Sequence, residues 1–313
     1  MSQPSKSSTA RRVIIIGAGI HALAAAKTYL EIKPDINLTL IDNDDSVGGV
    51  WSGSRVHSNL MADNPTPTFN FSDLEMKDEF NLPDWSNIPG PIMHEYFQRY
   101  AKKFDILRRC IFNTDVTGVE RDGKGWKVRT RTVGDDSTAK EQIFTCDVLM
   151  AATGNFSVPK LPDIDTSSFE GKIFHAKDFT KRSAELSSKD IQTVAVIGGN
   201  KSAFEAVCLS YKAGKKVHWL IRPDGAGPGL LMQASLPNGM SASRLGYLRV
   251  FGINFPSVYR QTRTWWDRFF LSGKNKWGKK LFDWFWEDAT FKRIGDRYEK
   301  SENGKLLRPD IVK

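Results

Sequence analysis

The sequence predicts an α/β protein with two Rossmann-like dinucleotide-binding domains. An apolar strand that runs into a glycine-rich turn and a helix occurs twice, in residues 13–42 and 194–222. Between the two units, short alternating segments predict a small antiparallel meander. The expected order is a flexible tail (1–12), a first nucleotide domain (13–162), a linker with a second nucleotide domain (163–235), and a helical segment rich in aromatic and basic residues (236–313).

The first unit begins with Val13–Ile16, an apolar, β-branched run typical of a buried parallel strand. It runs into Gly17-x-Gly19-x-x-Ala22. Gly17 permits the tight turn, Gly19 lets a pyrophosphate approach the backbone, and Ala22 lets the helix pack closely. This spacing favours a dinucleotide site over a βαβ turn that binds no phosphate.

The helix of this unit is expected to extend to about Glu31, with its N-terminal N–H groups directed at the phosphates. The following strand, Asn37–Ile41, ends at Asp42, whose carboxylate can accept a hydrogen bond from a ribose hydroxyl. Gly48-Gly49-Val50-Trp51 comes soon after. Two glycines there allow the backbone to lie against a ligand, although an ordinary turn beside a core tryptophan explains them equally well.

The bulk properties fit an ordinary globular protein. The net charge is +9, and residues 241–313 contribute +8 of it through 16 Lys+Arg and 8 Asp+Glu. Three cysteines lack metal-ligand spacing, so we expect no metal site, and buried thiols in a reducing, cytoplasmic compartment are the simplest interpretation. No apolar run is long enough to span a membrane. The basic, Ser-rich residues 1–12 predict a tail, with an organellar transit peptide as the alternative.

The chain between the two units reads as three parts. Residues 57–91 are polar and proline-rich, which predicts an irregular excursion, and Ile92–Phe104 has helical spacing. The meander is expected from four short strands: Cys110–Asn113, Val116–Arg121, Trp126–Thr130 and Glu141–Phe144. A buried strand then ends in Ala152-Thr-Gly154, where a glycine can lie under a cofactor.

The second unit repeats the pattern with two changes. The strand Val194–Ile197 leads into Gly198-Gly-Asn200-Lys201-Ser202, a helix to about Ala213, and the strand Lys216–Ile221. Asn200 replaces the middle glycine, and Asn tolerates a left-handed backbone better than most residues. Arg222 replaces the acid at the end of the second strand. A guanidinium attracts a 2′-phosphate, so the unit favours NADP over NAD, with a nucleotide-like fold that binds nothing as the alternative.

Phe169-x-Gly171-x-x-x-His175-x-x-x-Phe179, which lies between the two units, resembles the linker motif of flavin-containing monooxygenases. Gly48–Trp51, Ala152–Gly154 and Gly198–Ala203 also stand where that family has them. Residues 87–97 and 222–229 resemble its fungal branch. The resemblance implies an FAD- and NADPH-dependent monooxygenase that oxygenates a small organic substrate with O2 through a flavin hydroperoxide, in fungal secondary metabolism. Phe179 favours heteroatom oxygenation over Baeyer–Villiger insertion, and the substrate is left open.

The resemblance also assigns site residues. Asn64 is the expected catalytic residue near flavin and NADP, with Asp63 as its competitor, because the local pattern is shifted by about one residue. His175 is expected as a motif residue of the linker that belongs with the cofactor-binding set. The other expected cofactor-binding residues are Gly17, Ala18, Gly19, Ile20, Ala22, Asp42, Gly49, Val50, Trp51 and Gly154 for FAD, and Gly198, Asn200, Lys201, Ser202 and Arg222 for NADP(H).

Members of that family are longer than this chain, and no return strand of the flavin domain is recognised after residue 235. The alternative is therefore a truncated nucleotide-binding remnant, or a split subunit that needs a partner chain to complete the fold. Residues 260–286 hold five tryptophans and seven basic residues. They predict a helical insertion, with peripheral contact to an anionic membrane as the rival hypothesis. Interleaved Arg and Trp can also stack nucleobases, but no RNA-binding fold accompanies them, and no nucleic-acid partner is expected.

Overall fold

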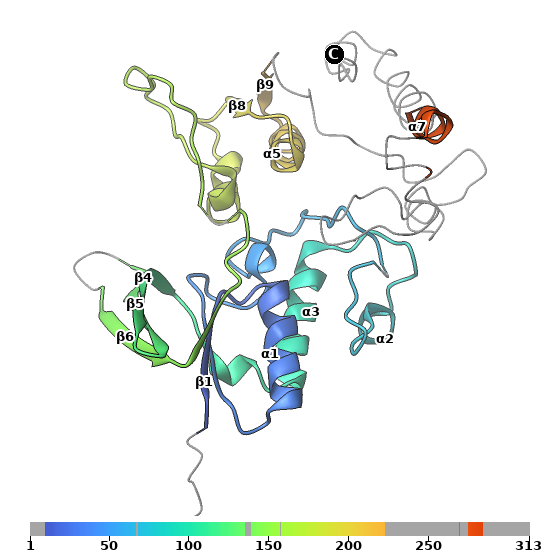
Figure 1. The fold of residues 1–313 in the computed structure, drawn as a ribbon. Coiled ribbons are helices and arrows are strands. Elements are labelled where there is room, and N and C mark those ends of the chain that lie inside the picture. The colour runs from blue at the N-terminus through green and yellow to red at the C-terminus, as the bar shows by residue number, and fades with distance from the viewer. Residues whose placement is uncertain are drawn as a thin grey trace, which may run out of the picture. The chain divides into compact units, whose positions relative to one another are not determined.

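A computed structural model of the chain describes residues 10–66, 68–134, 139–156, 158–222, 269 and 275–283 (Figure 1). The chain divides into two compact units, the first ending at Ala184 and the second beginning at Glu185. The linker residues up to 184, which the sequence placed with the second nucleotide domain, therefore lie in the first unit. Residues 1–9 of the expected tail are outside the described part, and Arg12 already belongs to the first strand.

The first unit is built on a parallel four-stranded sheet in the order β3-β2-β1-β7. Its strands are β1 (Arg12–Ile16), β2 (Asn37–Ile41), β3 (Cys110–Ile111) and β7 (Val148–Ala151). The central strand β1 pairs with both neighbours, with Ile16 opposite Ile41 on one side and Ala151 on the other. The carboxyl ends of three strands therefore meet at one edge of the sheet, where nucleotides bind in open α/β folds.

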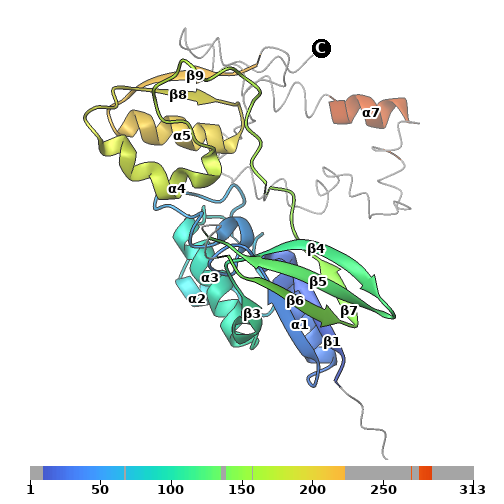
Figure 2. The ribbon, with the colours of Figure 1, turned by 90° about the vertical axis from the view of Figure 1, so that its left-hand side faces the viewer.

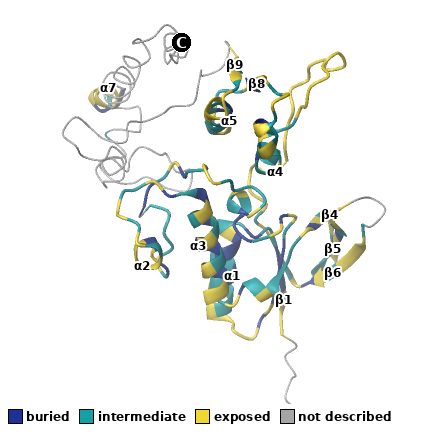
Figure 3. Cartoon of the chain, turned by 180° about the vertical axis from the view of Figure 1, so that it is seen from behind, coloured by how far each residue is buried: buried dark blue, intermediate teal, exposed yellow. Residues whose placement is uncertain are grey.

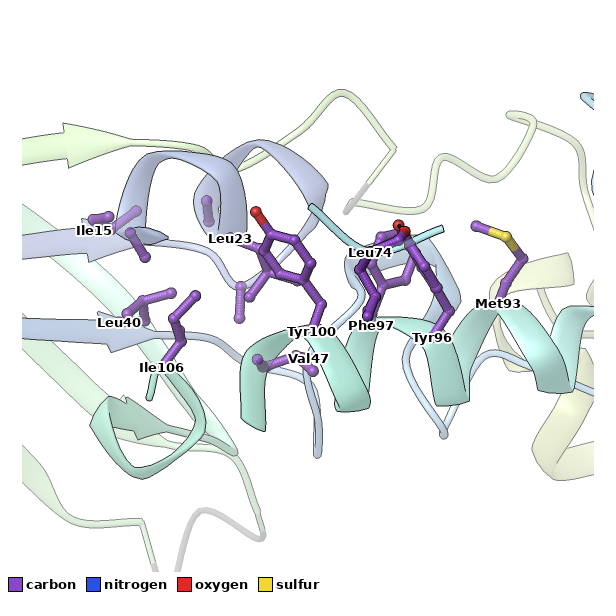
Figure 4. Close-up of a cluster of buried hydrophobic side chains, with 14 of the residues drawn as sticks. Ile15, Leu23, Leu40, Val47, Leu74, Met93, Tyr96, Phe97, Tyr100 and Ile106 are labelled. Carbon is purple, nitrogen blue, oxygen red and sulfur yellow. Dashed lines mark hydrogen bonds between the residues drawn. The ribbon is translucent and has the colours of Figure 1, made fainter. Parts of the chain in front are cut away.

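Two helices form the core with one face of this sheet. They are α1 (Ile20–Ile32) and α3 (Gly90–Lys103), and buried residues concentrate on them and on β1 (Figure 3). The small residues Ala22 and Ala26 are fully buried on α1. Tyr96, Phe97 and Tyr100 of α3 pack with Leu23, Ile15 and Leu40 (Figure 4). Apolar burial of this extent is the main source of stability in such a domain.

A three-stranded antiparallel sheet lies in the same unit, in the order β4-β5-β6 (Figure 2). Its strands are β4 (Thr114–Asp122), β5 (Gly125–Thr132) and β6 (Glu141–Cys146). The predicted meander is thus correct for three of its four strands. Cys110 was assigned to it wrongly: it begins β3, which pairs in parallel with β2, with Cys110 opposite Leu40. A two-residue strand is too short for its sequence pattern to distinguish the two sheets.

The excursion between β2 and β3 holds a short helix, α2 (Met76–Phe80), the predicted helix as α3, and the 3-10 turns η1 (Gly49–Trp51) and η2 (Leu107–Arg109). Further along, η3 (Ala176–Asp178), α4 (Phe179–Arg182) and η4 (Ser183–Ser187) follow the exposed residues 158–173.

The described core of the second unit is a single βαβ turn. It consists of β8 (Thr193–Ile197), α5 (Lys201–Lys212) and the parallel strand β9 (Lys216–Leu220). The predicted helical insertion in residues 260–286 lies mostly outside the described residues, and α7 (Lys276–Asp283) is its main described part. Among the described helices, none has the length and apolar character that a membrane crossing requires.

The three cysteines do not share one environment. Cys146 is buried and Cys110 is partly buried, and burial raises the pKa of the Cys110 thiol to about 12. Cys208 is exposed on α5. The expectation of three buried thiols is therefore wrong for Cys208, which lies on the outer side of an amphipathic helix.

Candidate nucleotide-binding sites

The first glycine turn can be built only from glycine at residue 17. Gly17 has a φ of +107°, and a Cβ atom placed on it would lie 2.4 Å from the carbonyl oxygen of Ala152. Its N–H donates to the carbonyl of Ile41 at 2.7 Å. The turn is thereby fixed against both neighbouring strand ends, those of β2 and β7.

A second glycine pair contacts this turn directly. The N–H of Gly48 donates to the carbonyl of Ala18 at 3.0 Å. A Cβ on Gly49 would lie 3.1 Å from the Cα of Gly19, so the two backbones approach as closely as glycine allows. Gly49 also has a φ of +61°. These contacts place the Gly48-Gly49 pair against the first glycine turn, and a ligand lying against its backbone stays a prediction.

Gly19 is the N-cap of α1, with extended backbone and no side chain to cap the helix. The N–H groups of the first helical turn, which starts at Ile20, therefore have no capping side chain at residue 19, and the positive end of the helix dipole faces the same place. Ala22 is fully buried at the helix–sheet contact, as its expected role requires. This arrangement suits a pyrophosphate.

The carboxylate of Asp42 is tied to the turn. Its Oδ2 accepts from the N–H of Ala18 at 2.5 Å, and its Oδ1 accepts from the N–H of Asp44 at 2.8 Å. Burial raises the pKa of the Asp42 carboxyl, and the two main-chain hydrogen bonds oppose this increase. A carboxylate has about four lone-pair positions, so it can still accept from a ribose hydroxyl.

An ion pair beside Asp42 was not anticipated from the sequence. Asp44 and Arg55 join in a forked contact, with Nη2 to Oδ2 at 2.9 Å and Nε to Oδ1 at 3.3 Å. Both side chains are only 10% exposed. The pair connects the end of β2 to the loop after η1, and the charge of Asp44 raises the pKa of Asp42 while the charge of Arg55 partly offsets that increase. The spacing of the two residues carries no recognisable motif.

Trp51 is half-buried in η1 and packs edge-on against Phe69, with ring centroids 6.2 Å apart. Its carbonyl oxygen lies 2.9 Å from Nδ1 of His94, a residue of α3 to which the sequence assigned no site role. The neighbouring Val50 is exposed. Helix α3 thus holds the tryptophan segment in place against the excursion.

Gly154 and Asn64 are further residues expected on the flavin side, and both lie in loops of the first unit. Gly154 is exposed, has a φ of +68°, and would have open space around a Cβ. Asn64 is half-buried and its competitor Asp63 is exposed. Their loop is anchored on both sides, because Ala62 donates to the carbonyl of Ile88 and Thr66 to that of Ser86. The catalytic role of Asn64 stays a prediction.

The linker motif is held by its own side chains. Nδ1 of His175 accepts from the N–H of Lys177 at 3.1 Å and so caps η3. Phe179 is buried against His57, with ring centroids 5.8 Å apart, and the hydroxyl of Thr180 donates to the carbonyl of Arg55 at 2.7 Å. The geometry gives His175 a structural part in this segment, and a contact with a cofactor stays a prediction.

The second glycine turn repeats the first. Gly198 has a φ of +129°, and its N–H donates to the carbonyl of Leu220 at 3.0 Å. Asn200 is the N-cap of α5 with a φ of −105°, so its tolerance of a left-handed backbone is not used here. N-cap residues are extended, and Asn is among the preferred ones. Its Oδ1 accepts from the N–H of Lys201 at 3.0 Å. Ser202 is exposed, and Lys201 pairs with Glu205 at 3.1 Å.

Strand register moves Arg222 by one position. Ile16 is paired with Ile41 in the first unit, and Ile197 is paired with Leu220 in the second. The equivalent of Asp42 is therefore Ile221, and the exposed Arg222 follows it. The prediction that Arg222 replaces the acid is therefore wrong by one residue, because the apolar Ile221 occupies the equivalent position. The carboxylate is still absent from this strand end, and the guanidinium of Arg222 belongs to the next residue.

The sequence profile described as flavin-binding monooxygenase-like matches residues 10–225, which include both glycine turns and the linker motif. The chain belongs to the flavin-binding monooxygenase-like family. It is 35% identical over 311 residues to an FAD-dependent monooxygenase of Pyrenophora dematioidea. The matched region covers 95% of this chain and 55% of that relative.

Two solved structures share the fold. Tmm from a Pelagibacter species matches with a TM-score of 0.57 at 25% identity, over 70% of this chain and 53% of the Tmm chain. OTEMO, solved in complex with FAD and NADP, matches with a TM-score of 0.61 at 19% identity, over 96% of this chain and 60% of the OTEMO chain. The chain spans about half the length of the flavin-binding monooxygenase-like relatives it matches.

Proposed function

We propose that this chain binds FAD at the turn of its first unit and NADPH at the turn of its second unit. In this proposal it supplies the nucleotide-binding part of a monooxygenase that oxygenates a small organic substrate with O2. The observation that carries the assignment is the difference between the two strand ends. The first ends in a carboxylate, Asp42, and the second ends in Ile221 and Arg222.

The residues of the first turn fit FAD. Gly17 and Gly49 let the turn pack against Ala152 and Gly19 where a Cβ would be too close, and the uncapped start of α1 offers N–H donors to a pyrophosphate. Asp42 provides an acceptor for the ribose. The fungal relative named above is itself called an FAD-dependent monooxygenase, which supports the same assignment.

The residues of the second turn fit NADPH. Asn200 and the start of α5 provide the phosphate-binding end of a helix. A carboxylate at the position of Ile221 would repel a 2′-phosphate, and its absence together with Arg222 favours the phosphorylated nucleotide. Lys201 also lies at the start of α5, where its ammonium group is paired with Glu205.

When bound, the flavin supplies the redox centre that the nicotinamide reduces and at which O2 is activated. The residues of this chain bind and orient the two nucleotides, and Asp42 holds the ribose while the glycine turns hold the phosphates. Trp51, backed by Phe69 and His94, provides an apolar surface close to the Gly48–Gly49 turn that keeps water out. Asn64 is the proposed catalytic residue near the flavin, and heteroatom oxygenation is the proposed reaction.

The direct test is the absorption spectrum of the purified full chain before and after reconstitution with FAD. We expect a yellow protein whose flavin absorption is bleached by NADPH under anaerobic conditions and far more slowly by NADH. A chain that retains no FAD after reconstitution would overturn the flavin assignment. A chain that retains FAD but is reduced equally fast by NADH would overturn the NADPH assignment.

A second candidate is a nucleotide-binding subunit that requires another polypeptide for oxygenation. The half-length coverage of the relatives favours it. The test is NADPH oxidation by the chain alone and after addition of a separately expressed polypeptide that corresponds to the C-terminal half of the fungal relative. Activity only in the mixture supports the split protein, and full coupled oxygenation by the chain alone excludes it.

Cytoplasmic location and peripheral membrane contact through residues 260–286 are further proposals. The basic and aromatic composition of that segment supports the contact. Co-sedimentation with vesicles that contain anionic lipid, compared for the chain with and without residues 260–286, tests it. Equal binding of the two forms would remove the membrane hypothesis.

A further inference from the structure

The indole of Trp219 is hydrogen-bonded to the second glycine turn. Its Nε1 donates to the carbonyl oxygen of Gly198 at 2.6 Å. Trp219 is the next-to-last residue of β9, and its half-buried ring packs edge-on against Phe204 of α5, with centroids 4.8 Å apart and planes at 76°. The side chain therefore contacts both the helix and the turn that leads into it.

Two successive residues of β9 form hydrogen bonds with the main-chain N–H and the main-chain carbonyl of Gly198. The carbonyl of Leu220 accepts from the N–H of Gly198 at 3.0 Å, and Trp219 donates to the Gly198 carbonyl. Gly198 has a φ of +129°, and glycine has few conformational restraints of its own because it has no Cβ. The two hydrogen bonds supply the restraint that glycine lacks.

The first unit secures its turn in a different way. The carbonyl of Ile41 accepts from Gly17, as Leu220 does from Gly198. The register equivalent of Trp219, however, is Leu40, which is fully buried and has no polar group in its side chain. The second tie in the first unit comes from Asp42, which accepts from the N–H of Ala18.

This difference matters for anion binding. A hydrogen bond to a carboxylate occupies a main-chain N–H of the turn, and N–H groups are the donors that bind phosphate oxygens. The second unit has Ile221 at the position of Asp42 and cannot form this hydrogen bond. Trp219 instead donates to a carbonyl oxygen of the turn, so its hydrogen bond does not occupy the N–H donors of Gly199 and Asn200.

We infer that Trp219 is a positioning residue for the second nucleotide, because it holds the Gly198–Asn200 turn in the conformation that receives the pyrophosphate of NADP. The inference rests on the proposed function, which assigns NADP to this turn. It adds a residue that lies outside the glycine motif and acts through the Gly198 carbonyl.

The test is isothermal titration of the FAD-loaded full chain with NADP⁺, for the wild type and for Trp219→Phe. The variant keeps an aromatic ring beside Phe204 and removes only the N–H donor. We expect NADP⁺ affinity to fall about 3- to 10-fold, the range of one neutral hydrogen bond, with the FAD content unchanged. Phe204→Leu is the matched control, because it loosens the ring contact and keeps the donor. It should lower the melting temperature and leave NADP⁺ affinity within about twofold.

A second measurement uses the folded wild type alone. Among the indole N–H signals in a ¹H–¹⁵N spectrum, the one absent from Trp219→Phe should shift when NADP⁺ is added. Equal NADP⁺ affinity of wild type and Trp219→Phe, or an unmoved indole signal, overturns the inference while the proposed function stands. If Trp219→Phe and Trp219→Tyr both fail to fold, Trp219 is a structural residue and the inference is wrong. A wild type that binds FAD but no NADP⁺ overturns the nucleotide assignment and this inference with it.

Discussion

The main-chain N–H of Ala18 and the carboxylate of Asp42 are joined at 2.5 Å, across 24 residues of sequence. Ala18 belongs to the glycine turn and Asp42 to the end of β2, so the bond makes one rigid unit of the phosphate-binding and ribose-binding parts of the site. Asp42 also accepts from Asp44, and Asp44 is paired with Arg55. The site acid is therefore held by hydrogen bonds within the protein itself, which reduces the ordering that nucleotide binding requires.

Asp42→Asn should weaken FAD binding about 10-fold or more, the range of one hydrogen bond to a charged group. An amide has one acceptor oxygen, so one of the two N–H donors from Ala18 and Asp44 would face an NH2 group. The measurement is the FAD content and FAD affinity of the purified full chain. Asp35→Asn, an exposed acid of the same unit, is the control and should bind FAD as the wild type does. Equal affinity in Asp42→Asn would show that the carboxylate does not serve the ribose.

The same residue predicts a pH dependence of stability in the FAD-free chain. Burial raises the pKa of Asp42 in the folded state above its ordinary 3.8. A raised carboxyl pKa means that the folded chain holds the proton more tightly than the unfolded chain. Its contribution to stability is thus present below pH 3.8 and lost as the pH rises through the folded-state pKa. Urea unfolding as a function of pH should show this loss in the wild type. If Asp42→Asn has the same dependence of unfolding free energy on pH as the wild type, the pH dependence does not come from Asp42.

Gly17→Ala should destabilise the first unit far more than Gly123→Ala. Both glycines have a positive φ, so both substitutions carry a backbone cost of about 1–2 kcal/mol. Only Gly17 adds a steric clash, since its Cβ would lie 2.4 Å from the Ala152 carbonyl, whereas nothing lies within 4 Å of a Cβ on Gly123. Thermal unfolding and FAD content of the two variants separate the clash from the backbone term. Similar melting temperatures for the two would contradict the close approach of the turn to β7.

The sequence predicted the first βαβ unit almost residue by residue, because its apolar strand, glycine spacing and terminal acid are all local signals. The helix expected to reach Glu31 ends at Ile32, and the strand Asn37–Ile41 has the expected bounds. The sequence did not predict that Cys110 joins the parallel sheet or that Asp44 pairs with Arg55. These depend on which segments meet in space, and neither strand length nor residue spacing encodes that. Arg222 was misplaced by one residue because its position depends on strand register.

Arg55→Met should lower the free energy of unfolding of the first unit by about 3–5 kcal/mol, because it leaves the Asp44 carboxylate buried without its partner. The matched control is Arg129→Met, which breaks a pair with Glu120 whose side chains are 53% and 42% exposed. That loss should be about 1 kcal/mol or less. Urea unfolding of both variants gives the comparison. The double variant Arg55→Met/Asp44→Leu should recover part of the loss, and an effect of Arg55→Met no larger than that of Arg129→Met would mean that the pair is solvated.

Arg222→Ser should change the choice between the two nicotinamide nucleotides. Arg222 is exposed at the end of β9, beside Ile221, so its guanidinium can meet a 2′-phosphate without a competing carboxylate on the strand end. We expect NADP⁺ affinity to fall about 10-fold or more, as for one charge-assisted contact, and NAD⁺ affinity to stay unchanged. Titration of the FAD-loaded chain with each nucleotide measures both. Lys216→Ser removes a positive charge at the opposite end of the same strand and should affect neither nucleotide. A parallel fall in NAD⁺ affinity would mean that Arg222 supports the fold or the pyrophosphate and does not select the 2′-phosphate.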